Sequence, residues 1–448
     1  MTHDVVVLGA GPSGSVVARR LASAGARVAL VGGASRPGWE GLSERSRALL
    51  AEEGEEVPAG VICGPFRRRG AWAGGRSVEG TEWLVERHRL AEALCANARS
   101  AGADYRSDTV TGVIQEGGHW RAHLRAGGTL AAPLVIEARG RRGAERRGPL
   151  LLAVGQQFHV QRAGAPGART QPGTQIHATD VGWCWWAAHA RALWVQIVGR
   201  PRAGHPAAWL AAAAAQIPVL ARVLDDAVPD GDPVARPAHA RLGLAGCDPT
   251  RWRVGDAAVA LDPLSGQGVY EALRGARLVA TAIESVLGGG DAPLAQRFVA
   301  ERQVESWARG VRMAAGFYRE NAECSAFWAD TAAAYEALLP QVARVAARIE
   351  RRPVLCAGRI ILREVVVTAE HPRGVWHVAG VPLVSLKGYL ESAEHATVAG
   401  AAAALDRPPP AVASAIQWLQ QTGMVARRIR PSMSSGGSIR VDRFREGL

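Results

Sequence analysis

The residues with the clearest chemical capacity stand near the N-terminus, where three glycines follow an apolar run at positions 5–8 and precede an amphipathic stretch. A second apolar run follows at positions 28–31, so the pattern predicts a β-α-β unit. Glycines at this place permit a tight turn, the close approach of a pyrophosphate and close packing of helix on strand. The sequence therefore predicts a dinucleotide-binding turn rather than an ordinary glycine turn. Its residues are Gly9, Gly11, Pro12, Ser13 and Gly14.

A second glycine-rich segment covers positions 255–268, and an acid stands just after its start. Such an acid can accept hydrogen bonds from a ribityl or ribose hydroxyl, and a helix entered through Gly-x-Gly directs free N–H groups at an electron-rich ligand. Together with the N-terminal turn, this segment points to a flavin. Its candidate ligands are Asp256, Pro263, Gly266, Gln267 and Gly268.

One part of a dinucleotide site is missing from the sequence. The second strand of such a unit ends in Asp or Glu, which holds the adenosine ribose. Here Val31 is followed by Gly32 and Gly33. We expect ribose binding to be weaker or to come from another segment.

Other candidates stand on the segments between the two glycine motifs. Ser43 caps a predicted helix whose first turn carries Arg45. This arginine could reach the phosphates or ring of a cofactor, or lie on a solvated helix face. Glu40, His88 and His189 are candidate bases, and each histidine could equally be a core or surface residue.

The densest aromatic stretch is a predicted strand around Trp183. Strand alternation places Trp183 and Trp185 on one face and Cys184 and Trp186 on the other. The first pair could form a wall beside a planar substrate, because aromatic rings stack on aromatic ligands. Packing in a core is the alternative.

Composition argues against several classes of function. The 448 residues are 48% hydrophobic, enough for two or three domains. The formal net charge of +12 comes from arginine, since Lys387 is the only lysine. We attribute this bias to coding composition and expect no nucleic-acid partner. The six cysteines show no metal-ligand spacing, and neither a leader nor an apolar run of about 18 residues is visible. A cytoplasmic protein without membrane contact is expected.

The order of elements predicts an α/β protein. We expect a two-dinucleotide-type (glutathione-reductase-like) FAD domain, an inserted antiparallel-sheet substrate domain and a small C-terminal winged-helix-like module with a basic hairpin near Ser438. A helical period from residue 294 to about 349 should end before Pro353. The predicted boundaries are 1–75, 101–150 and 245–350 for the FAD domain, 76–100 and 151–244 for the substrate domain, and 360–448 for the C-terminal module.

With these motifs placed, the chain resembles FAD-dependent aromatic monooxygenases of the para-hydroxybenzoate-hydroxylase type, and more closely their halogenase-like branch. The resemblance covers about residues 1–350 and rests on segments 9–14, 40–45 and 255–268. It implies FAD, O2 and an external reductant, NAD(P)H or reduced flavin, which together give a C4a-hydroperoxide that transfers oxygen. It also implies that Arg45 contacts the flavin and that Asp256 binds its ribityl chain.

Two departures argue against halogenation. The resemblance to flavin halogenases would require Trp-x-Trp-x-Ile-Pro, but here Trp185 and Trp186 are followed by Ala187 and Ala188. Those enzymes also need a lysine between the two glycine motifs, whereas Lys387 stands in the C-terminal part. Arginine is no substitute, because its guanidinium stays protonated.

With halogenation disfavoured, hydroxylation is the reaction that the resemblance implies. The chain is similar to the flavoproteins that hydroxylate a protein tryptophan during tryptophylquinone formation, as in quinohemoprotein amine dehydrogenase maturation. This resemblance implies dihydroxylation of a tryptophan in the small subunit of a quinoprotein, a polypeptide that another maturation enzyme would deliver. Trp183, Trp185, Glu40 and His189 are the candidates for the catalytic site. The alternatives are a small-molecule aromatic or polyketide hydroxylase, a flavin halogenase, and a DNA-binding regulator with a sensing flavin domain.

Overall fold

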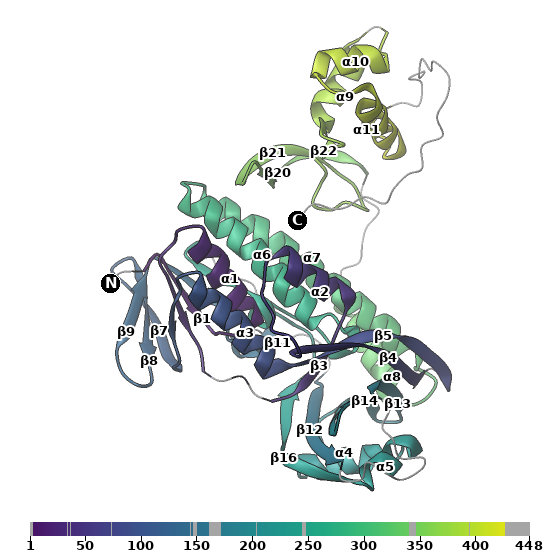
Figure 1. The fold of residues 1–448 in the computed structure, drawn as a ribbon. Helices are drawn as coiled ribbons and strands as arrows, with labels where there is room; N and C mark the ends of the chain where they lie inside the picture. Colours follow the sequence, from purple (N-terminus) through teal and green to yellow (C-terminus); the bar gives the residue numbers. More distant parts are fainter. Residues whose placement is uncertain are drawn as a thin grey trace. The chain divides into compact units, whose positions relative to one another are not determined.

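The computed structural model describes residues 3–425 except 34, 36, 73, 144, 147–149, 161–171, 203, 244–247, 340–345 and 394. Contacts divide the chain into two compact units (Figure 1). The first comprises Met1–Glu284 and Arg302–Leu339, and the second Ser285–Glu301 and Pro340–Leu448. The basic hairpin predicted near Ser438 lies outside the described residues.

The first unit contains a five-stranded sheet with the order β18-β10-β1-β2-β6, in which every neighbouring pair is parallel. The fully buried strands β1 and β2 are continuous apolar runs, and β10 is apolar except for its last residue Glu137, as expected for a parallel sheet covered on both faces. The chain leaves β1 toward β2 on one side and later adds β10 on the other, so β1 marks a topological switch point. The strands are β1 (Val5–Leu8), β2 (Val28–Val31), β6 (Asp104–Arg106), β10 (Leu134–Glu137) and β18 (Arg251–Arg253).

Helix α1 (Pro12–Ser23) joins β1 to β2 and packs against α3 (Arg87–Ser100), which confirms the predicted β-α-β unit. The chain also forms an antiparallel meander of three strands, β7 (Val110–Glu116), β8 (His119–Leu124) and β9 (Thr129–Ala132). Its core residues pack with those of the parallel sheet.

The second large sheet has eight strands in the order β16-β12-β15-β14-β13-β4-β5-β3, and only β13 and β4 pair in parallel. One face packs against α7 (Ala292–Glu320) and α8 (Ala326–Glu336), and the other against α4 (Pro206–Ala214) and α5 (Pro218–Leu224). We call the first the inner face. The strands are β3 (Trp39–Leu42), β4 (Ile62–Trp72), β5 (Arg76–Glu86), β12 (Leu152–Val160), β13 (Gly173–Thr179), β14 (Gly182–His189), β15 (Ala192–Gly199) and β16 (Ala227–Pro237).

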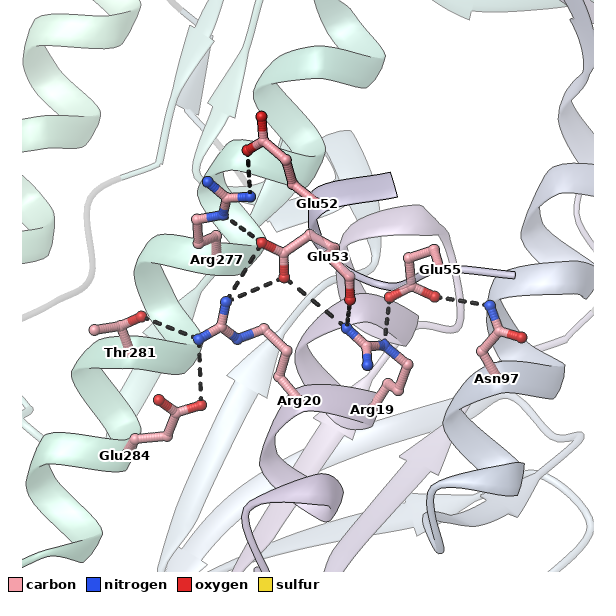
Figure 2. A network of polar contacts seen from close by, with 9 residues as sticks. All are labelled: Arg19, Arg20, Glu52, Glu53, Glu55, Asn97, Arg277, Thr281 and Glu284. Carbon is pink, nitrogen blue, oxygen red and sulfur yellow. Dashed lines mark hydrogen bonds and ion pairs between the residues drawn. The ribbon is translucent and has the colours of Figure 1, made fainter. Parts of the chain in front are cut away.

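A buried ion-pair network fixes the end of α2 (Glu44–Glu52) against α1 and α6 (Gly268–Leu287), as Figure 2 shows. The Glu53 side chain is only 3% exposed; it pairs with Arg20, 3.1 Å away, and with Arg277. Beside it, Arg19 Nε donates to Glu55 over 2.6 Å, and Asn97 of α3 donates to the same carboxylate over 2.8 Å. Helix α2 is thereby tied to three other helices.

The second unit holds the hairpin β20 (Arg348–Cys356) and β21 (Arg359–Val367) and the helices α9 (Leu383–Ser392), α10 (Val398–Leu405) and α11 (Pro409–Gln421), which share one core. We predicted that a helix continues to residue 349 and breaks before Pro353. This prediction is wrong at the C-terminal end of the helix. Helix α8 ends at Glu336, and Pro353 lies inside β20. A two-stranded sheet tolerates proline, because each strand has an edge that needs no N–H donor.

The network around Glu53 gives a stability prediction. Glu53→Ala removes the buried carboxylate that Arg20 and Arg277 share and leaves them only their more exposed partners Glu284 and Glu52, so it should lower the free energy of unfolding by about 3 kcal/mol. Glu52→Ala is the matched control, because Glu52 also pairs with Arg277 but is 62% exposed. It should cost less than about 1 kcal/mol. Urea unfolding followed by tryptophan fluorescence measures both, and equal losses would contradict the prediction.

Candidate functional site

The two glycine-rich segments meet at the carboxyl edge of the parallel sheet. Gly9 has a φ of +115°, and a Cβ there would lie 2.5 Å from the carbonyl oxygen of Ala138, which follows β10. Gly255 has a φ of +59°, and a Cβ there would collide with the hydroxyl of Ser13. Gly14 packs equally closely on Gly9. Backbone and small side chains therefore fill this contact, and larger residues would force the segments apart.

The free space at this edge suits a cofactor with a pyrophosphate. Gly11 caps α1, and a Cβ at Gly11 would meet no atom within 4 Å. The first N–H groups of α1 have no helical acceptor, and no acid stands in its first turn, so the helix end favours an anion. Gly266 and Gly268, before and at the start of α6, also face open space. The residues present fit FAD at both glycine segments.

The structure explains why no acid follows β2. A Cβ at Gly32 would collide with the backbone of Ala10 in the N-terminal turn. Gly32 is also held by the hydroxyl of Tyr105, which donates to its carbonyl oxygen over 2.9 Å. An acid at position 32 would displace the turn that is predicted to bind the pyrophosphate.

Asp256 lies just beyond β18, with its side chain 39% exposed. It accepts from Nε of Arg141 over 3.2 Å. Arg141 also donates to the carbonyl oxygens of His239 at 2.6 Å and Leu261 at 2.7 Å. Sequence reasoning missed Arg141, which orients the carboxylate predicted to bind the ribityl chain.

Arg45 lies in the first turn of α2, where Ser43 accepts from the N–H of Ser46 as the predicted cap. The guanidinium is exposed and lies over the ring of Tyr270, 4.8 Å from its centroid, at the start of α6. Its Nη2 donates to the Tyr270 hydroxyl over 3.3 Å. The structure thus brings Arg45 next to the segment that carries Gln267 and Gly268.

A buried carboxylate beneath this segment was not predicted. Asp262 accepts from the N–H of Leu264 over 2.9 Å and from the hydroxyls of Tyr335 and Tyr318 over 2.7 and 3.1 Å. Burial raises the pKa of Asp262, and these hydrogen bonds and the charge of Arg141 oppose the rise. The pKa values of both tyrosines are raised as well, first by the burial of the tyrosines themselves and then by the negative charge of Asp262.

The aromatic strand β14 alternates as predicted. Trp183 and Trp185 lie on the inner face in the same core cluster as Leu264, and the Trp183 indole N–H donates to the Tyr318 hydroxyl over 3.2 Å. Cys184 and Trp186 pack on the other face with α4, and burial raises the pKa of Cys184. Trp183 therefore joins the inner face to the network around Asp262.

Each of the three candidate bases has its own immediate contacts. Glu40 pairs with Arg87, and His88 lies 3.5 Å from the carboxylate of Glu86. His189, at the end of β14, lies beside aromatic rings of β3 and β4, and its Nδ1 is buried without a hydrogen-bond partner in the described part of the chain. A catalytic role for any of them stays a prediction.

The described residues form neither a metal site nor a membrane-spanning helix. No group of three or more His, Cys, Asp or Glu side chains among them is arranged to hold a metal ion. No described helix has the length and hydropathy needed to span a membrane.

The contact between Gly255 and Ser13 gives a prediction about cofactor binding. Gly255→Ala should weaken FAD binding, because a left-handed alanine is strained by roughly 1–2 kcal/mol and its Cβ displaces Ser13. Gly275→Ala inside α6 is the control: its Cβ would meet nothing closer than 3.9 Å, and helix propensity favours it by about 1 kcal/mol. Titration with FAD, followed by flavin fluorescence, compares them. Wild-type affinity in Gly255→Ala would show that the segments need not meet.

The buried Asp262 gives a prediction about pH. Because its pKa is raised in the folded protein, protonation favours the folded state. The free energy of unfolding of the wild type minus that of Asp262→Asn should therefore fall as pH rises through the raised pKa, by up to about 1.4 kcal/mol per pH unit. Asp330→Asn, which alters an exposed pair with Arg200, is the control and should show no such slope. Urea unfolding at several pH values measures this difference in the free energy of unfolding. A difference that rises with pH would refute the raised pKa of Asp262.

No protein-family model and no curated protein match the sequence. Several solved structures are similar to this chain. The peptidyl tryptophan dihydroxylase QhpG, essential for tryptophylquinone cofactor biogenesis, is 27% identical, with a TM-score of 0.79 over 95% of this chain and 100% of its own. The flavin-dependent halogenase CmlS is 17% identical, with a TM-score of 0.71 over 94% and 95%. The myxobacterial chondrochloren halogenase CndH, an FAD-dependent enzyme, is 23% identical, with a TM-score of 0.59 over 73% and 85%.

The halogenases share the fold, and the dihydroxylase shares both the fold and more of the sequence. The residues at the carboxyl edge of the parallel sheet fit the cofactor of these enzymes. The fold of this chain is thus the one shared by the tryptophan dihydroxylase and the flavin-dependent halogenases, and its similarity to the dihydroxylase is consistent with a flavin-dependent monooxygenase.

Proposed function

We propose that this enzyme hydroxylates, twice, a tryptophan side chain of a partner polypeptide during the formation of a tryptophylquinone cofactor. The observation that carries the proposal is the likeness to the peptidyl tryptophan dihydroxylase QhpG along 95% of this chain and the whole of the other. The partner would be the small subunit of a quinoprotein, delivered with another maturation enzyme. We assign the reaction to the cytoplasm, where the free cysteines of the described chain stay reduced.

The side chains favour hydroxylation over halogenation. The only lysine of the sequence, Lys387, lies in α9 of the second unit and pairs with Glu391. Arginine cannot take the part of a lysine amine, because it stays protonated. The inner face offers indole rings and apolar side chains, which suit a planar aromatic substrate.

FAD, with O2 and an external reductant, NAD(P)H or reduced flavin, supplies an electrophilic oxygen atom. The chain has three tasks in this chemistry. The glycine segments and Asp256 would hold the cofactor, and Arg45 would lie beside its ring. The packed residues around Trp183 and Leu264 exclude water, and the inner face orients the substrate ring.

Mass spectrometry of small-subunit peptides tests this function. After incubation with FAD, a reductant and O2, a peptide tryptophan should gain about 32 Da, the mass of two oxygen atoms supplied by O2. Incubation under isotopically labelled O2 should increase the mass gain by the extra mass of the two labelled oxygen atoms. Incubation without reductant is the control. Unmodified peptides, together with oxygenation of a free aromatic compound, would replace the proposal with a small-molecule hydroxylase.

A further inference from the structure

The inner face of the eight-stranded sheet carries one carboxylate whose place suggests a direct role. Side chains on a strand alternate between faces, so Glu82 shares the face of Leu84 on β5. Leu84 is part of the inner core cluster together with Trp183 and Leu264. Glu82 therefore stands on the face that packs against the glycine-rich segment 255–268, although the Glu82 side chain itself is only half-buried.

One hydrogen bond and one close packing contact position the Glu82 carboxylate. The hydroxyl of Thr174, a buried residue of β13, donates to Oε1. The other oxygen, Oε2, lies so close to Gly41 of β3 that a Cβ there would collide with it. Gly41 stands four residues before Arg45 in the sequence. A glycine at this position thus leaves room for a fixed acceptor near the arginine expected to contact the flavin.

Aromatic rings stand beside this carboxylate. Phe66 is the cross-strand partner of Glu82. The His189 ring lies 5.2 Å from the Phe66 ring and 6.3 Å from the Trp39 ring, centroid to centroid, and is tilted to both. Within the described part of the chain, His189 Nδ1 and Arg68 Nε are buried and have no hydrogen-bond partner. The patch therefore combines ring faces, a carboxylate acceptor and polar atoms whose hydrogen-bonding capacity is unused.

We propose that Glu82 accepts the N–H of the substrate indole and that Trp39, Phe66 and His189 surround the ring. This inference rests on the proposed function. An indole carries a single donor, and burying it without an acceptor is unfavourable. A carboxylate gives the stronger, charge-assisted form of this hydrogen bond. Aromatic neighbours add stacking and edge contacts that favour a planar ring.

The position also matches the charge that develops during oxygen transfer. A C–O bond forms between the electrophilic oxygen and a ring carbon, which leaves positive charge on the indole nitrogen. Loss of the C–H proton from that carbon then restores the aromatic ring. Each hydroxylation consumes one O2 and two reducing equivalents, and the second oxygen atom leaves as water. A carboxylate at the N–H stabilises the positive charge more in the transition state than in the bound substrate.

The test compares Glu82→Gln with Glu79→Gln. Glu79 stands on the same strand, but on the opposite face, 59% exposed and paired with Arg67. Glu82→Gln should lower kcat/KM for a small-subunit peptide roughly 10- to 100-fold, the usual range for losing a charged hydrogen-bond partner. Glu79→Gln should leave it unchanged. Titration with FAD should give wild-type affinity in both variants.

A substrate analogue separates this role from a structural one. A peptide in which sulfur replaces the indole N–H keeps the ring shape but has no donor. Wild-type enzyme should discriminate strongly against it, and Glu82→Gln should discriminate much less. Equal discrimination by both enzymes, or a Glu82→Gln variant as active as the wild type, would overturn the assignment of Glu82. A wild-type enzyme that modifies no peptide would instead overturn the proposed function, and the inference with it.

Discussion

The arrangement of the site depends on one buried carboxylate. Asp262 is withdrawn from water, and a buried carboxylate is tolerated only when donors surround it. Its donors come from its own turn, from α7 and from α8. Tyr318 in turn accepts from Trp183 of β14. The segment that precedes Gly266 therefore cannot move relative to the inner face of the sheet without leaving a charge unpaired. Cofactor edge and substrate face are held together by the same few hydrogen bonds.

A second constraint is steric and acts where the backbones meet. At Gly9, Gly14 and Gly255 the space for a Cβ is taken by a carbonyl group or a hydroxyl, so the two halves of the cofactor site fit only because side chains are absent. The same crowding at Gly32 removes the acid that would hold the ribose. The departure from the usual motif thus follows from the close approach of two turns.

Local patterns were enough to predict the parallel sheet, the N-terminal turn and the alternation of β14, because each is encoded by residues a few positions apart. The partners of Asp262 lie 56 and 73 residues away, and Arg141 lies 115 residues from Asp256, so nothing in their own segments reveals them. Glu82 was not singled out because β5 carries four charged residues and looks like a surface strand. Pro353 led to a wrong prediction of a helix end. A two-stranded hairpin tolerates a proline that a helix does not, so Pro353 lies inside β20.

The proposed chemistry of the inner face depends on two features, the carboxylate of Glu82 and the absence of lysine from the first unit. Hydroxylation of an inert ring needs a base strong enough to generate an electron-rich anion, but an indole is already electron-rich. An acceptor at the indole N–H would then be sufficient, and Glu82, which accepts from Thr174 and occupies the space that Gly41 leaves, is our proposal for that acceptor. The first unit has no lysine that could capture an oxidised halide, which favours the proposed direct transfer of oxygen to the ring. The absence of one residue type and the placement of one carboxylate thus favour the same reaction.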